Sequence, residues 1–151
     1  MSKKIYLAYG SNLNVKQMGY RCPEATVLGT TFLEGFELIF RGRHEAAVAT
    51  VEPKDGSRVP VLLWETSTND ERALDHYEGY PYLYRKECIE VVFNGELVTA
   101  YIYMMNGDRP ISTPGCHYYA TIREGYKDCG FDEAFLKDAA LKSAMGGSLD
   151  I

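Results

Sequence analysis

The sequence has few of the features that would place a protein in or across a membrane. None of its hydrophobic runs approaches the roughly 18 consecutive apolar residues that a membrane span requires. Behind the lysines of the opening "MSKK", the apolar run is interrupted by "YGSN". This run is too short for the apolar core of a signal peptide. We therefore expect no membrane association and no secretion signal.

Cysteine pairs and histidine clusters are also lacking. The four cysteines are widely and unevenly spaced, and no C-x-x-C pair occurs. The three histidines, His44, His76 and His117, have no metal-ligand spacing among them. Disulfide frameworks and structural zinc sites show regular, closer spacings. We therefore expect free thiols, no metal site and a reducing, cytoplasmic location.

An excess of positive charge is absent as well. The chain has 16 basic and 21 acidic residues, a formal charge of −5, and its basic residues are scattered. A nucleic-acid-binding face needs a basic stripe, often interleaved with aromatic residues, so nucleic acid is not an expected partner. What is present is an ordinary globular composition, 46% hydrophobic over 151 residues. That length fits one domain, 1–151, with a core large enough to fold.

Strand-forming segments fill most of the first two thirds of the chain. They are rich in strand formers and are bounded by turn residues. These segments are 5–8, 31–40, 45–53, 59–67 and 87–105. In the last of them, Asn94-Gly95 lies between two apolar runs and predicts a tight hairpin.

Helices are predicted around and after these strands. A short helix begins after Asn14, with Gln17 placed as in a capping box, and ends before Pro23. The segment 67–79 predicts a second helix, with Thr68 and Glu71 as its capping box and Gly79 at its end. Apolar residues at 118, 122 and 126 predict a third helix, and a fourth is expected from about Asp132 to Gly146-Gly147. Strands first and helices later indicate an α+β fold with a mostly antiparallel, barrel-like sheet.

The stretch "YGSN" runs from a buried strand directly into a helix start. Such a turn presents backbone N–H groups that lack internal partners and can bind an anion. Gly10 would let a ligand approach the backbone, while Ser11 and Asn12 could add hydrogen bonds. We expect a small anion at the backbone of Gly10 to Leu13. The alternative is an ordinary turn, since Gly, Ser and Asn are common in turns.

A second unusual stretch is "LDHYEGYPYLYRK". Glu78 follows Leu74 by four residues, so both project from one helix face. If Leu74 packs inward, Glu78 is drawn toward the core at the helix C-terminus, where burial and the helix dipole both raise its pKa. Such a carboxylate is a candidate general base. The alternative is a solvated glutamate at a helix end. The tyrosines expected around Glu78 are Tyr77, Tyr80, Tyr82 and Tyr84.

Together the two stretches resemble a known family. "YLAYGSNLN", "LDHYEGYP" and "YYATIREGYKDCGF" are similar, in order and spacing, to the γ-glutamylcyclotransferase-like (AIG2-like) family. The resemblance extends from about Ile5 to Phe131. It implies a small six- or seven-stranded mixed β-barrel with flanking helices, and an activity that needs no cofactor.

The resemblance also implies roles for individual residues. The residues Tyr9, Gly10, Ser11 and Asn12 correspond to the loop that holds a γ-glutamyl group. Glu78 corresponds to the catalytic acid/base. Tyr84, Tyr103 and Tyr118 correspond to substrate-binding tyrosines, of which Tyr103 and Tyr118 are expected to face one cavity with Glu78.

The implied activity is an intramolecular aminolysis. In a γ-glutamyl amide the α-amine closes a five-membered ring on the γ-carbonyl and releases 5-oxoproline and a free amine or amino acid. The partner is thus a small γ-glutamyl molecule. The alternative is a binding module of the same fold that holds an acidic metabolite without converting it. The sequence identifies neither the amine that is released nor the oligomeric state.

Overall fold

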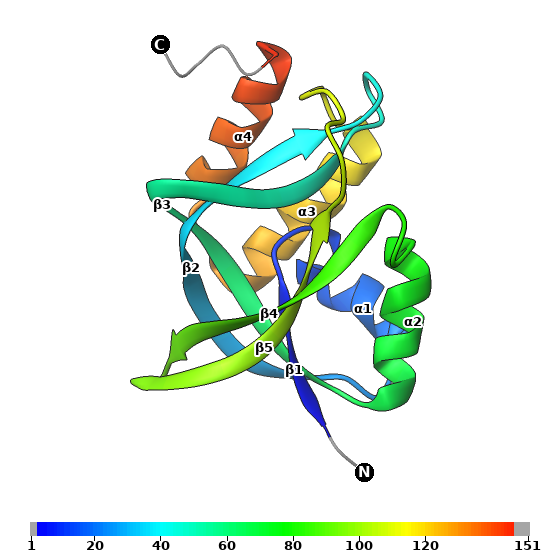
Figure 1. The fold of residues 1–151 in the computed structure, drawn as a ribbon, viewed down its shortest axis with the longest axis vertical. Helices are drawn as coiled ribbons and strands as arrows, with labels where there is room; N and C mark the ends of the chain where they lie inside the picture. The colour runs from blue at the N-terminus through cyan, green and yellow to red at the C-terminus, as the bar shows by residue number, and fades with distance from the viewer. Residues whose placement is uncertain (1–2, 147–151) are drawn as a thin grey trace.

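A central sheet organises the protein, as seen in a computed structural model that describes residues 3–146. Five strands lie in the order β2-β3-β1-β5-β4 (Figure 1). The strands are β1 (Lys4–Ala8), β2 (Thr26–Arg41), β3 (Val48–Thr66), β4 (Tyr84–Phe93) and β5 (Glu96–Met105). All neighbours are antiparallel except β1 and β5, which are parallel. The α+β class and the mostly antiparallel sheet are confirmed.

The closed barrel of six or seven strands is not observed. The described residues form five strands, and β2 and β4 remain the two edges of an open sheet. The edges nevertheless approach one another, because the Thr31 hydroxyl donates a hydrogen bond to the Val92 carbonyl at 2.6 Å. A Cβ at Gly29 would lie only 2.8 Å from the Phe93 ring. Side-chain contacts, rather than a backbone ladder, therefore bring the edges together.

The segments 45–53 and 59–67, predicted as separate strands, belong mostly to the single strand β3, which begins at Val48 and ends at Thr66. The intervening turn-like residues bulge out of the ladder, since Glu34 pairs with Arg58 while Phe36 pairs with Pro53. A bulge of this kind bends a strand without ending it. The Asn94-Gly95 hairpin is confirmed, with positive φ values of 52° and 79° that suit a tight two-residue turn.

The helices begin and end near the predicted residues. They are the short 3₁₀ helix η1 (Ser11–Leu13), α1 (Val15–Arg21), α2 (Thr68–Glu78), α3 (Cys116–Cys129) and α4 (Ala134–Ala144). Asn14 caps α1 by accepting the Gln17 N–H at 3.0 Å, which is one half of the predicted capping box. The other half is not formed, because the Asn14 N–H donates to the Ser11 carbonyl. None of the described helices is long and apolar enough to cross a membrane.

The ends of α2 and α4 refine two predictions. The capping box of α2 is formed by Ser67 and Asp70, one residue earlier than the predicted pair Thr68 and Glu71. Gly79 ends α2 in the left-handed conformation, as predicted. Helix α4 starts two residues after Asp132, and the predicted end at residue 147 lies outside the described residues.

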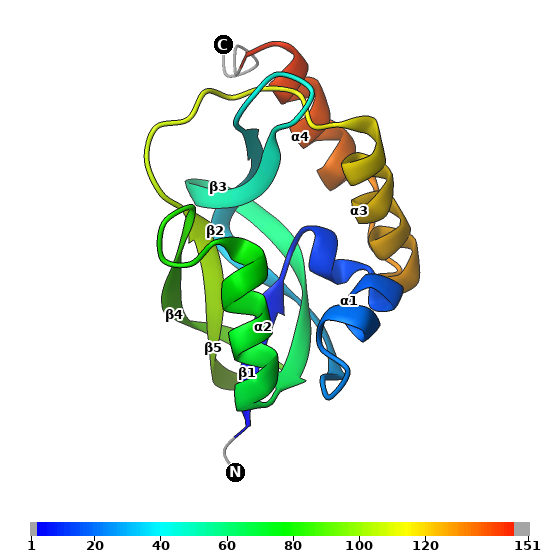
Figure 2. The same ribbon diagram turned by 90° about the vertical axis from the view of Figure 1, so that its right-hand side faces the viewer.

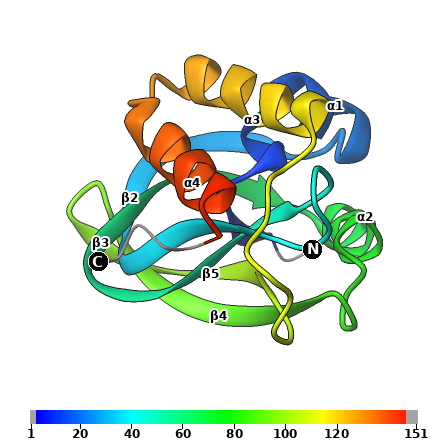
Figure 3. The same cartoon turned by 90° about the horizontal axis from the view of Figure 1, so that it is seen from above.

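Helices cover the sheet from different sides. In Figure 3, α3 and α4 lie along one side of the sheet, and α2 lies at its right-hand end. Figure 2 shows α2 in front of β1 and β5, with α1 beside α3. The Phe135 ring of α4 packs 5.8 Å from the Phe32 ring of β2. The largest fully buried aliphatic side chains include Leu7, Leu63, Leu74, Ile102 and Ile122.

Helix α3 also packs directly against the turn that follows β1. A Cβ at Gly125 would lie 2.7 Å from the Leu13 carbonyl carbon and 2.8 Å from the Asn14 nitrogen. Only glycine permits this approach, because real Cβ atoms essentially never come so close. The contact therefore sets the position of the "YGSN" turn relative to the helices.

Candidate active site

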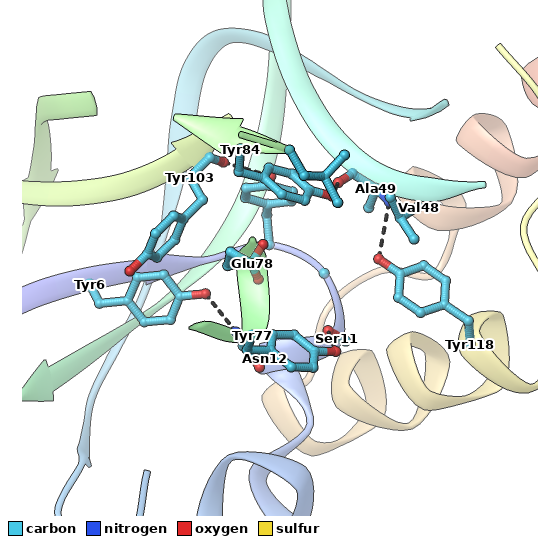
Figure 4. A pocket seen from close by; sticks show the side chains of 13 residues that line it. Tyr6, Ser11, Asn12, Val48, Ala49, Tyr77, Glu78, Tyr84, Tyr103 and Tyr118 are labelled. Carbon is cyan, nitrogen blue, oxygen red and sulfur yellow. Dashed lines mark hydrogen bonds between the residues drawn. The ribbon is translucent and has the colours of Figure 1, made fainter. Parts of the chain in front are cut away.

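A cavity of about 250 Å³ opens where the "YGSN" turn, the end of α2 and the start of α3 meet the sheet (Figure 4). Most of its lining residues are tyrosines or belong to the turn. They are Tyr6, Tyr9, Gly10, Ser11, Asn12, Val48, Ala49, Tyr77, Glu78, Leu83, Tyr84, Tyr103 and Tyr118.

Glu78 is the acidic residue in this lining. Leu74, one turn earlier on α2, is fully buried, and the helix ends at Gly79. The side chain of Glu78 is thereby directed into the cavity, where Figure 4 shows it among the tyrosines. Burial raises the pKa of Glu78 to about 7, although the Arg21 guanidinium acts in the opposite direction. No side chain among residues 3–146 forms a hydrogen bond or an ion pair with the Glu78 carboxylate.

The "YGSN" turn supplies part of the opposite wall. The Leu13 N–H donates to the Gly10 carbonyl at 3.0 Å, and the Asn14 N–H donates to the Ser11 carbonyl at 3.1 Å. The N–H groups of Ser11 and Asn12 have no acceptor among the described residues. Leu13 was expected to bind substrate, but it is fully buried and lies outside the cavity lining. We do not retain Leu13 as a site residue.

Asn12 is held on three sides. Its amide nitrogen donates to the Tyr6 hydroxyl at 2.9 Å, its side-chain oxygen accepts from Arg21, and its backbone carbonyl accepts the Trp64 indole N–H at 3.1 Å. Asn12 is also nearly fully buried. Its side chain therefore braces the turn, and the backbone N–H is the group that remains for a ligand.

Two tyrosines hold the backbone of one residue of β3, Ala49, through the peptide groups on either side of it. The Tyr84 hydroxyl donates to the Ala49 carbonyl at 2.6 Å, and the Ala49 N–H donates to the Tyr118 hydroxyl at 3.0 Å. Tyr118 accepts in this contact, so its own O–H remains free to donate into the cavity. The oxygen of Tyr84 keeps lone pairs that can accept. Burial raises the pKa of both phenols, which keeps them neutral.

Tyr103 connects the cavity wall to an ionic network behind α2. Its backbone carbonyl accepts the Tyr9 hydroxyl at 2.7 Å, and its own hydroxyl donates to Asp75 Oδ1 at 2.6 Å. The Lys86 ammonium lies 2.8 Å from Asp75 and 2.7 Å from Glu71. Tyr103 thus contributes its ring to the cavity, while its hydroxyl belongs to the network.

The structure brings together most of the predicted site residues. Tyr9, Gly10, Ser11 and Asn12 line one cavity with Glu78, Tyr84, Tyr103 and Tyr118. Of the tyrosines expected around Glu78, Tyr80 and Tyr82 are exposed and lie outside the cavity lining. Tyr6, Val48, Ala49 and Leu83 were not predicted. Strand alternation is a signal for Tyr6, because it pairs with Tyr101 and so shares a sheet face with Tyr103.

A larger groove of about 960 Å³ adjoins the cavity. Ser11, Tyr77 and Tyr118 line both spaces, so the groove begins at the cavity mouth. Its other lining residues are mainly polar and include Arg21, His44, Glu45 and His117. Within the described residues, no group of three or more His, Cys, Asp or Glu side chains is arranged to hold a metal ion.

Comparison with known proteins connects this cavity to a family. The family model "Gamma-glutamyl cyclotransferase, AIG2-like" matches residues 6–121. The chain belongs to this family. The matched residues include the "YGSN" turn, α2 with Glu78, and the start of α3.

Relatives of known sequence and structure agree with this assignment. A mouse "Gamma-glutamylcyclotransferase" is 26% identical over 145 residues, covering 87% of this chain and 74% of the mouse protein. A solved "Gamma-glutamyl cyclotransferase" shares the fold with a TM-score of 0.80 and 24% identity, covering 91% of this chain and 86% of that one. An uncharacterised human protein gives a TM-score of 0.81 at 24% identity, covering 92% and 87% of the two chains.

Proposed function

We propose that this member of the γ-glutamylcyclotransferase family is an enzyme that converts a γ-glutamyl amide into 5-oxoproline and a free amine or amino acid. The observation that carries the proposal is the Glu78 carboxylate. It lies in a tyrosine-lined cavity, has a pKa raised to about 7, and has no partner among the described side chains. A group with a pKa near neutrality can accept a proton and return it at physiological pH.

The size of the cavity suits the γ-glutamyl group. A γ-glutamyl group has about nine non-hydrogen atoms, and a cavity near 250 Å³ lies at or below the roughly 300 Å³ lower limit of sites for larger ligands. The leaving amine would extend through the cavity mouth at Ser11 and Tyr77 into the adjoining groove. The cavity thus selects the glutamyl head, while the groove accommodates the variable part.

The polar groups of the lining match a zwitterionic head. The N–H groups of Ser11 and Asn12 would bind the substrate α-carboxylate, as unpartnered backbone amides bind anions. The α-ammonium would lie near Glu78. The free O–H of Tyr118 can donate to the γ-carbonyl oxygen as negative charge develops on it.

Glu78 would serve first as base and then as acid. Its carboxylate takes a proton from the α-ammonium, and the resulting amine attacks the γ-carbonyl carbon to form the ring C–N bond. Collapse of the tetrahedral intermediate breaks the original amide C–N bond as Glu78 returns its proton to the leaving nitrogen. The second proton that the ring nitrogen must lose passes to the released amine, which departs as an ammonium ion. Because the nucleophile belongs to the substrate, holding the chain bent removes much of the entropic barrier.

The proposal includes a small-molecule γ-glutamyl substrate and a cytoplasmic location. The four cysteines are free thiols, and two of them, Cys88 and Cys116, are exposed. Exposed free thiols are typical of reducing compartments.

The test is a panel of γ-glutamyl amino acids, glutathione and γ-glutamyl-ε-lysine, scored for release of 5-oxoproline. We expect release from at least one member of the panel and loss of that release in Glu78→Gln. Binding of these ligands without any 5-oxoproline would instead establish a binding module. If the protein neither binds these ligands nor releases 5-oxoproline, the proposal is overturned altogether.

A further inference from the structure

The two motifs that form the site lie far apart in the sequence, and Arg21 contacts both. Arg21 is the last residue of α1 and belongs to neither motif. Its guanidinium donates to the side-chain oxygen of Asn12, in the "YGSN" turn. On its other side it stacks 3.6 Å from the centre of the Tyr77 ring, one residue before Glu78. Arg21 therefore lies between the turn and the last turn of α2.

Tyr77 also contacts the "YGSN" turn directly. Its hydroxyl lies 2.9 Å from the Ser11 hydroxyl, so Ser11 and Asn12 are both tied to Arg21, one through Tyr77 and one directly. These are the two cavity-lining residues of the turn whose backbone N–H groups have no acceptor among the described residues. A planar guanidinium suits such a position, since it can stack on a ring and donate hydrogen bonds in its own plane.

Arg21 also brings a positive charge close to the cavity, whose lining residues other than Glu78 are uncharged. The other titratable residues that line the cavity with Glu78 come from α2 itself and from the neighbouring elements: Tyr6 and Tyr9 of β1 and its following turn, Tyr77 of α2, Tyr84 of β4, Tyr103 of β5 and Tyr118 of α3. All are phenols, and burial raises the pKa of Tyr6, Tyr9, Tyr84, Tyr103 and Tyr118. Asp75, the nearest acid along α2, is paired with Lys86.

We infer that Arg21 is a positioning residue that holds the "YGSN" turn against the end of α2 and places a positive charge beside the cavity that contains Glu78. The inference rests on the proposed function and adds to it the residue that joins the two halves of the site. Burial disfavours a carboxylate anion, and a nearby cation partly offsets that cost. Arg21 lowers the pKa of Glu78 in this way, against the larger effect of burial.

Two substitutions separate the charge of Arg21 from its hydrogen bond. Arg21→Gln keeps an N–H donor for Asn12 but removes the charge, whereas Arg21→Lys keeps the charge but loses the planar stacking surface. The matched control is Arg123→Gln, because Arg123 pairs with Glu133 on an exposed face of α3, away from the cavity. Thermal unfolding of all three variants reports their folding.

The first readout is the titration midpoint of the Glu78 carboxyl, followed by ¹³C NMR and assigned with Glu78→Gln. It requires no turnover. We expect the midpoint to rise in Arg21→Gln and to stay close to the parent value in Arg21→Lys and Arg123→Gln. An unchanged midpoint in a folded Arg21→Gln would overturn the electrostatic part of the inference. If Arg21→Gln does not fold, Arg21→Lys serves as the test. A clear rise of the Glu78 midpoint in folded Arg21→Lys, which keeps the charge, would overturn the electrostatic part as well.

The second readout is the rate of 5-oxoproline release across pH. We expect kcat/KM to fall roughly 10–100-fold in Arg21→Gln at pH 7, since misplacement of reacting groups has effects of that order. The acidic limb of the kcat/KM profile of Arg21→Gln should move to higher pH. Arg21→Lys should lose kcat/KM with no such movement, because the turn is less well held while the charge remains. Parent-like kcat/KM in both variants would overturn the positioning role, whereas a parent protein without 5-oxoproline release would overturn the proposed function itself.

Discussion

Two of the carboxylates on helix α2, Asp75 and Glu78, lie three residues apart in opposite surroundings. Asp75 accepts the Tyr103 hydroxyl and lies 2.8 Å from the Lys86 ammonium. Glu78 faces a cavity and has no such partner among the described residues, so the effect of burial exceeds that of the Arg21 guanidinium and raises the pKa of Glu78 to about 7. The paired carboxylate stabilises the structure, while the unpaired one remains available for proton transfer.

The largest effect is expected from changing the unpaired acid to its amide. Glu78→Gln keeps the size of the side chain but removes proton transfer, so turnover should fall by roughly 10²–10⁴. Folding should persist, because an enclosed carboxylate that resists ionisation does not stabilise the structure. The measurement is 5-oxoproline release together with calorimetric binding of a γ-glutamyl ligand.

A folded Glu78→Gln variant with parent-like release would show that Glu78 is not the base. We expect Glu78→Gln to bind the γ-glutamyl ligand but to release little 5-oxoproline, because in the proposed mechanism the turn binds the substrate and Glu78 transfers the protons.

The pH dependence of activity should report the raised pKa of Glu78 directly. The base must be ionised in the free enzyme, so kcat/KM should fall about tenfold per pH unit below pH 7, and roughly a hundredfold by pH 5. The profile is measured with the best substrate of the panel. An acidic limb near pH 4.5, the ordinary value for glutamate, would contradict the assignment.

The same shift has a consequence for stability with a defined sign. The folded state binds a proton at Glu78 more tightly than the unfolded state does, so this contribution to stability is complete below about pH 4.5 and is lost as pH rises through 7. Glu78→Gln lacks the titration. Its free energy of unfolding should therefore decline less than that of the parent between pH 5 and pH 8, as measured by urea unfolding.

Asp75→Asn, the matched change at the paired acid, should lower stability more and turnover less than Glu78→Gln. Asp75→Asn removes the ion pair with Lys86 and weakens the hydrogen bond from Tyr103, which should lower the free energy of unfolding by about 1–2 kcal/mol. Turnover should fall less than in Glu78→Gln. Urea unfolding and 5-oxoproline release test this pair, and a greater loss of turnover in Asp75→Asn than in Glu78→Gln would remove the contrast between the two acids.

The smallest effect is expected at Gly10, in the cavity wall. A Cβ there would lie 3.4 Å from the Ala49 Cβ and 3.7 Å from the Tyr118 hydroxyl, which are ordinary contact distances. Gly10→Ala should therefore fold, but it should raise KM a few-fold, on the order of 1 kcal/mol, by narrowing the space beside Tyr118. Gly19→Ala is the control, since a Cβ at Gly19 meets nothing within 4 Å. A KM equal to that of the parent would place the substrate elsewhere.

Local chemistry explains what could be predicted from the sequence. The hairpin at Asn94-Gly95 and the end of α2 at Gly79 depend on backbone conformations that these residues adopt readily, and both were predicted correctly. The inward position of Glu78 was predicted because a helix places residues four apart on one face; Leu74 is buried and Glu78 lines the cavity.

What could not be predicted depends on contacts between distant segments. The position of β1 between β3 and β5 follows from pairings across the whole chain, and the turn-like residues inside β3 suggested an end that does not occur. Arg21 has no motif of its own, and its role emerges only from its contacts with Asn12 and Tyr77. Ala49 contributes through its backbone N–H and carbonyl groups, which no side-chain pattern reveals.

The way Tyr84 and Tyr118 hold position 49 has a consequence for how this cavity can diversify. Both hydroxyls bind backbone atoms of Ala49, the carbonyl oxygen and the N–H, so their anchoring is independent of the side chain at that position. The Ala49 Cβ meanwhile lies beside the cavity wall at Gly10. Exchange of Ala49 for a smaller or larger residue can therefore change the volume of the cavity without dismantling its hydrogen bonds. Position 49 is accordingly a site at which evolution, or an engineer, can alter substrate size while the reacting groups stay in place.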